Sequence, residues 1–101
     1  MTDGFITLTL EVTEEGKQFV SRCKELDVTS CGDSLDEAME NIRKATLQYL
    51  NAIHELGESP RIFKEKGIVI RKRAPATVRR EYRVSPGSLV GPYVTRVPVT
   101  A

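Results

Sequence analysis

The sequence predicts an α+β fold with a three-stranded antiparallel meander, one long helix, a fourth strand and an extended C-terminal arm. Three observations lead to this prediction. Residues 5–13 alternate between apolar and polar side chains from Ile6 onward, as a half-buried strand does. Residues 34–57 carry one apolar stripe at helical spacing. Prolines then recur at positions 75, 86, 92 and 98, too closely for a helix of ordinary length.

The meander is expected from three β-prone runs separated by turn residues. In the first run, the alternate residues Ile6, Leu8, Leu10 and Val12 share one face. Gly16 then supplies a turn, because glycine adopts positive φ without strain. The second strand is predicted over residues 17–24, and a short third strand over residues 28–31.

The helix has recognisable start and stop signals. Ser34 followed by Glu37 fits a capping box, in which both side chains satisfy free amides of the first turn. Gly57 is the expected residue just beyond the end. Its apolar face comprises Leu35, Ala38, Met39, Ile42, Ala45, Thr46, Tyr49, Leu50, Ile53 and Leu56.

The residues after the helix, 58–101, are predicted to form shorter elements and an extended tail. Residues 58–60 are predicted to be a connector, 61–63 a brief structured turn, and 67–72 the fourth strand. We expect a folded domain over residues 1–73 and a basic, proline-punctuated extended tail over 74–101. The tail contains short β-prone runs that could be donated to a neighbouring subunit.

Length and composition indicate one soluble domain. The chain has 101 residues, of which 40% are hydrophobic and 29% charged. No apolar run reaches the roughly 18 residues of a membrane span. The N-terminus begins with Asp3 where a secretory signal would place a base, so a cytoplasmic location is expected. Cys23 and Cys31 are expected to be free thiols.

Charge is strongly segregated along the chain. The formal net charge is only +1, but residues 1–60 carry −7 and residues 61–101 carry +8. Such a distribution indicates binding partners or self-association, and does not bear on fold. Attraction between the two halves, within or between subunits, is the simplest alternative.

Motifs for catalysis, metals or cofactors are absent from the sequence. Gly87–Gly91 lacks the spacing and the lysine of a phosphate-binding loop. The single histidine, His54, falls near a helix end, where a solvent-facing role is usual. We therefore expect no enzyme activity, no catalytic residue, no metal and no cofactor.

A basic stretch makes nucleic-acid binding an alternative. Its members are Arg71, Lys72, Arg73, Arg79, Arg80 and Arg83. These side chains could neutralise several phosphates, which would give salt-dependent affinity without sequence specificity. The C-terminal part has neither a helix-turn-helix nor a ribbon-helix-helix pattern.

Residues 23–45 resemble the HicB-like antitoxin family. The resemblance lies in Gly32-Asp33-Ser34, the following Leu35-Asp36-Glu37-Ala38 and the Tyr49-Leu50 pair, and it extends over residues 4–73. It implies a β-β-β-α-β, partial ribonuclease H-like fold and a protein that neutralises a small basic, mRNA-cleaving HicA-type toxin. Many family members also carry a C-terminal DNA-binding domain, which this sequence lacks, so a solitary homologue is an alternative.

The expected toxin-binding residues are acids of the strands and their turns. They are Glu11, Glu14, Glu15, Glu25 and Asp27. A basic partner would favour such a surface electrostatically. Because a four-stranded sheet with one helix leaves a sheet face uncovered, we also expect a homodimer or a homotetramer.

Overall fold

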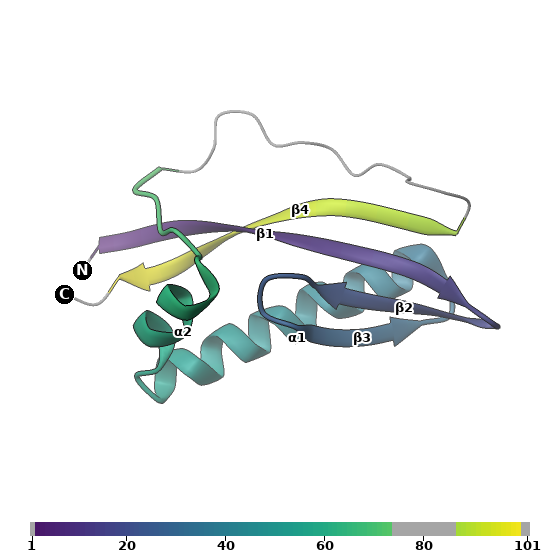
Figure 1. The fold of residues 1–101 in the computed structure, drawn as a ribbon, viewed down its shortest axis with the longest axis horizontal. Helices are drawn as coiled ribbons and strands as arrows, with labels where there is room; N and C mark the ends of the chain where they lie inside the picture. Colours follow the sequence, from purple (N-terminus) through teal and green to yellow (C-terminus); the bar gives the residue numbers. More distant parts are fainter. Residues whose placement is uncertain (1, 74–86, 100–101) are drawn as a thin grey trace.

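The sheet and one long helix form the body of the molecule. The computed structural model describes residues 2–73 and 87–99, in which four antiparallel strands pair in the order β3-β2-β1-β4 (Figure 1). The elements are β1 (Thr2–Glu15), β2 (Gln18–Cys23), β3 (Val28–Gly32), α1 (Leu35–Glu55), α2 (Ser59–Lys66) and β4 (Ser88–Val99). The predicted α+β class and the β-β-β-α-β order are confirmed.

The core lies between β1, β2 and α1. The alternating residues of β1 predicted to face inward, Ile6, Leu8, Leu10 and Val12, are all fully buried. They pack with the apolar stripe of α1, which contributes Ala38, Met39, Ile42, Leu50 and Ile53. Burial of such side chains is the main favourable term in folding, at roughly 2 kcal/mol each.

Helix α1 begins and ends where the sequence indicates. The Ser34 hydroxyl accepts a hydrogen bond from the Glu37 amide at 3.0 Å. At the other end Gly57 has φ +70°, and its amide donates to the His54 carbonyl. The Glu58 amide donates to the Ile53 carbonyl, which completes a Schellman motif.

The predicted connector after α1 is in fact partly helical. Residues 59–66 form α2, with Pro60 in its first turn, where the missing amide costs nothing. Phe63 is buried, and Gly67 ends the helix in the left-handed conformation. The brief turn expected at residues 61–63 is therefore the middle of a two-turn helix.

The fourth strand exists, but its predicted position is wrong. Residues 67–72 contribute only an isolated bridge between Phe5 and Arg71, whereas residues 88–99 pair with β1 along its length. The run 68–70 is apolar without alternation, and Val69 stays 62% exposed. By contrast, β4 alternates and turns Leu89 and Val97 into the core. The sheet therefore includes residues beyond the boundary predicted at 73. The β-prone run 78–84 lies outside the described residues.

Candidate functional site

Glu25, one of the five predicted partner-binding acids, is bound within the fold. Its carboxylate accepts hydrogen bonds from the Thr9 amide at 2.7 Å and from the Thr9 hydroxyl at 2.9 Å. These bonds fasten the β2–β3 loop to β1, where the ladder with β2 begins. Glu25 therefore has a structural role within the fold.

Two further predicted acids share one arginine. Arg22 lies opposite Glu11 on the neighbouring strand, at 4.0 Å, and its Nε is 3.2 Å from the Asp27 carboxylate. All three side chains are at least one third exposed, so these ion pairs contribute little to stability. Arg22 compensates at most one of their two negative charges.

The other two predicted acids lie at one end of the sheet, together with three acids from the start of α1. Glu14, Phe19 and Gly32 form one row across β1, β2 and β3, so β1 ends beside the point where α1 begins (Figure 1). We call this set of exposed residues the acidic end: Glu14, Glu15, Asp33, Asp36 and Glu37.

Close backbone packing holds the acidic end together. A Cβ atom on Gly32 would lie 2.5 Å from the Ala38 nitrogen, so only glycine allows β3 to approach the first turns of α1 this closely. The helix dipole stabilises the acids of the first turn. Among the described residues, none of the five acids forms an ion pair, although Lys17 lies in the nearby turn.

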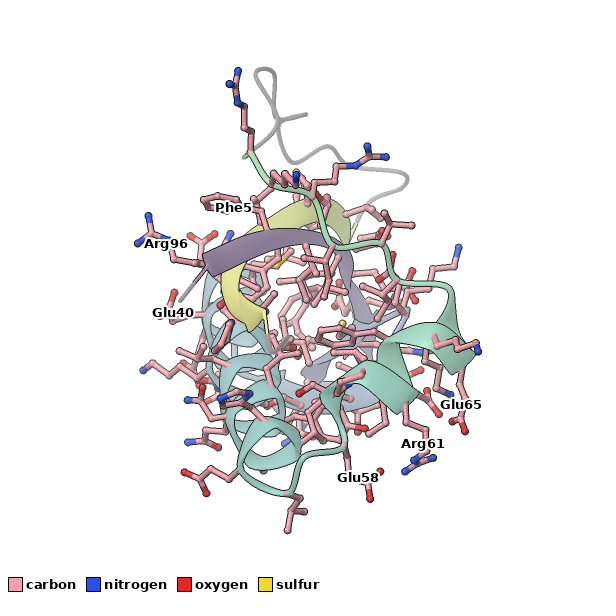
Figure 2. The ribbon with its side chains drawn as sticks, turned by 90° about the vertical axis from the view of Figure 1, so that its left-hand side faces the viewer. Phe5, Glu40, Glu58, Arg61, Glu65 and Arg96 are labelled. Atoms are coloured by element: carbon pink, nitrogen blue, oxygen red, sulfur yellow. The ribbon has the colours of Figure 1, made fainter. Side chains whose placement is uncertain are left out.

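Six of the described bases lie at the opposite end of the molecule, in α2 and the segment after it. We call this set the basic end: Arg61, Lys64, Lys66, Arg71, Lys72 and Arg73, all exposed. Arg61 is bound by Glu58 at 2.6 Å and Glu65 at 3.0 Å, and these carboxylates raise the pKa of its guanidinium (Figure 2).

The alternative nucleic-acid residues are only partly described. Arg71 is anchored through its backbone, because its amide and carbonyl both bond to Phe5, at 2.9 and 2.7 Å. Lys72 and Arg73 follow directly and are exposed. Arg79, Arg80 and Arg83 lie outside the described residues.

Other candidate groups do not form a site with the acids. His54 is half-buried and lines a small pocket with Arg96 of β4. Both cysteines are free, and burial raises the pKa of the Cys23 thiol, whereas Cys31 is exposed. Within residues 2–73 and 87–99, no three His, Cys, Asp or Glu side chains are grouped as a metal site requires. No described helix combines the length and hydropathy of a membrane span.

Sequence reasoning missed three members of the acidic end. Helix capping accounts for the place of Asp33, Asp36 and Glu37 in the chain, but not for their neighbours in space. The meander was the available signal, because three antiparallel strands necessarily return the end of β1 to the side of the helix start.

Comparison of the chain with protein-family models, curated proteins and solved structures gives no match.

Proposed function

We propose that this chain acts by binding, as an antitoxin-type protein that neutralises a small basic, mRNA-cleaving protein in the cytoplasm. The resemblance of residues 23–45 to HicB-like antitoxins motivates the proposal. The observation that carries it is the acidic end, where five exposed carboxylates from β1 and the start of α1 lie together without ion-pair partners among the described residues.

Electrostatics explains why this end suits a basic partner. Five like charges at one end repel one another, and a cationic surface relieves that repulsion on binding while steering the encounter. The surface is also preorganised, because β1, β3 and α1 are fixed there by core packing. Little ordering entropy is then lost when the partner binds.

Co-expression with any small basic protein that a neighbouring gene encodes tests the proposal. We expect co-purification, and loss of the partner's mRNA cleavage when the full chain is added. Glu14→Lys should raise the dissociation constant about tenfold, because it places a like charge against the partner.

Glu55→Lys is the matched control for this experiment. It makes the same charge change on exposed α1 surface at the opposite end, and should leave the affinity nearly unchanged. If the two substitutions weakened the affinity for the partner equally, net charge and not the acidic end would account for binding. The proposal is also rejected if no basic neighbour binds.

Nucleic-acid binding is the second candidate, favoured by the anchored run of bases after α2. The two backbone bonds between Arg71 and Phe5 hold the Arg71-Lys72-Arg73 run at the edge of the sheet. Replacing these three bases with alanine should lower the salt dependence of RNA or DNA affinity by about 0.9 for each phosphate that is no longer neutralised. Alanine at Lys17, Lys24 and Lys44 removes the same charge elsewhere and should have little effect.

A further inference from the structure

The outer face of the sheet, which points away from α1, carries an aromatic ring beside an arginine. Ile6 is fully buried in the core, so the alternation of β1 turns its neighbour Phe5 to the outer face, where it is partly exposed. Arg96 lies opposite Phe5 in the pairing of β1 with β4. The Arg96 guanidinium lies over the ring, 5.5 Å from its centre (Figure 2).

Arg71 flanks the same ring from the other side of β1. Its amide and carbonyl both bond to Phe5, at 2.9 and 2.7 Å, so the two residues lie directly opposite each other in an antiparallel bridge. Side chains of directly opposite residues leave a sheet on the same face. Arg71, Phe5 and Arg96 therefore form one row across the outer face, which we call the stacking row. Both arginines are exposed.

The surroundings of the stacking row are basic and polar. Lys72 and Arg73 follow Arg71 directly in the chain and are exposed. Thr7, the next residue of β1 on this face, is also exposed. A partly exposed ring between two guanidinium groups, with further bases beside it, matches a ligand that has flat aromatic groups joined by negative charges. Nucleic acid has this chemistry.

We infer that the stacking row binds single-stranded RNA, with one base stacked on the Phe5 ring and phosphates bound by the bases at 71–73. The planar guanidinium of Arg96 stacks on aromatic faces, so it covers the other face of the bound base. Duplexes are excluded because their bases are already stacked on one another. The bound base is not specified, since all four present a π face.

Thr7 is the reason for assigning RNA and not DNA. Its exposed hydroxyl stands two residues along β1 from Phe5, on the same face of the sheet. A hydroxyl in this place can form a hydrogen bond with the ribose 2′-hydroxyl of a bound nucleotide, a group that DNA lacks.

This inference rests on the second candidate function, because it uses the same run of bases after α2. It adds the form of nucleic acid that binds and the residue that holds a base. It is independent of the antitoxin proposal, since Glu14 and Phe5 lie toward opposite ends of β1.

Titration of a fluorescein-labelled oligouridylate with the full chain, followed by anisotropy over a salt series, tests the inference. Phe5→Leu should raise the dissociation constant about thirtyfold, because the stacked ring is lost. It should leave the salt dependence unchanged, because no charge is removed. Arg71→Gln should instead lower the slope of log affinity against log salt by about 0.7, the value for one phosphate of a single strand.

Phe19→Leu is the matched control for this titration. It makes the same change at a partly buried phenylalanine that packs against the core, and should leave the affinity unchanged. Circular dichroism reports whether each variant remains folded. The matched oligodeoxyuridylate should bind the native chain about fivefold more weakly, and Thr7→Val should abolish this difference.

Phe5→Trp gives a direct signal from the site. The sequence contains no tryptophan, so the new indole is the only one in the chain. An indole ring keeps the stacking surface, so this variant should bind the oligouridylate at least as tightly as the native chain. Stacking of a base on the indole should quench its fluorescence, with the same dissociation constant as the anisotropy titration gives.

The outcomes separate this inference from the function on which it rests. If Phe5→Leu and Phe19→Leu have equal effects, or if bound RNA leaves the fluorescence of Phe5→Trp unchanged, the stacking row is refuted while binding through phosphates stands. If neither RNA nor DNA binds, both fail. Equal affinity for the deoxy oligomer, or tighter binding of a duplex, would overturn the assignment to single-stranded RNA.

Discussion

The acidic end and the basic end are built differently. At the acidic end the charges stand on β1 and on the start of α1, and Gly32 brings the backbones of β3 and α1 into direct contact. At the basic end they stand on the short α2 and on a segment held by the Phe5–Arg71 bridge. The acidic end is thus held by close backbone contact between β3 and α1, and the basic end by the burial of Phe63 and the two backbone bonds between Phe5 and Arg71.

Replacing one glycine at each end should give the largest difference between the ends in the free energy of unfolding. Gly32→Ala places a Cβ 2.9 Å from the Ala38 Cα and the Glu37 carbonyl carbon, which are backbone atoms and cannot rotate away. We expect a loss of about 3 kcal/mol in the free energy of unfolding. Gly67→Ala meets no atom within 4 Å and should cost only about 1 kcal/mol, from its φ of +68°. Urea denaturation measures both, and equal losses would contradict the contrast.

Substitutions at Glu25 and Glu14 should distinguish an acid with a structural role from the exposed acids of the acidic end. Glu25→Ala removes both hydrogen bonds to Thr9 and should cost about 2 kcal/mol in the free energy of unfolding. Glu25→Gln should cost much less, because its amide can accept from the Thr9 amide and donate to the Thr9 hydroxyl. Glu14→Ala serves as the control and should leave stability unchanged. A large loss from Glu14→Ala would mean that the acidic end is itself part of the structural framework.

The two helix N-termini offer a smaller contrast. Ser34 caps α1 through its hydroxyl, whereas Glu58 makes no side-chain cap for α2. Ser34→Ala should therefore lower the free energy of unfolding by about 1 kcal/mol. Glu58→Ala removes only an exposed ion pair with Arg61 and should cost under about 0.5 kcal/mol. Thermal unfolding followed by circular dichroism shows which substitution costs more stability. A larger loss from Glu58→Ala than from Ser34→Ala would contradict the assignment of Ser34 as the cap.

The smallest effect on stability is expected at alkaline pH, from Cys23 in the core between the two ends. Burial raises the pKa of the Cys23 thiol above 9.0 in the folded state. The unfolded chain then releases this proton first as pH rises, so the contribution of Cys23 is complete below 9.0 and is lost above it. The stability advantage of the native chain over Cys23→Ala should therefore narrow above this pH. An advantage that stays constant or grows there would contradict the raised pKa.

Most of the fold could be predicted because its signals are local. Alternation in residues 5–13, the Ser34 cap and the Gly57 stop each act within a few residues, and each is confirmed. The fourth strand could not be placed, because 67–72 and 93–99 are both β-prone. The choice between them depends on which run fits along β1, at long range in the chain.

The candidate site was predictable only in part. Glu14 and Glu15 follow from charge and turn position, but the bonds of Glu25 to Thr9 could not be predicted, because they join residues sixteen positions apart. Glu11 and Asp27 were identified as acids, yet their shared partner Arg22 follows from strand register. A set of carboxylates in a sequence does not show which of them the fold already binds.

The sequence by itself determined the class of fold, the core residues of β1 and α1, and the opposite charges of its two halves. Periodicity and capping are properties of neighbouring residues, so they can be read without coordinates. Only the tertiary structure decided which strand completes the sheet and which acids lie at one end without an ion pair among the described residues. It also placed both prolines of β4 at positions that face away from β1. Those features depend on strand pairing, which brings distant residues together according to how well their surfaces fit.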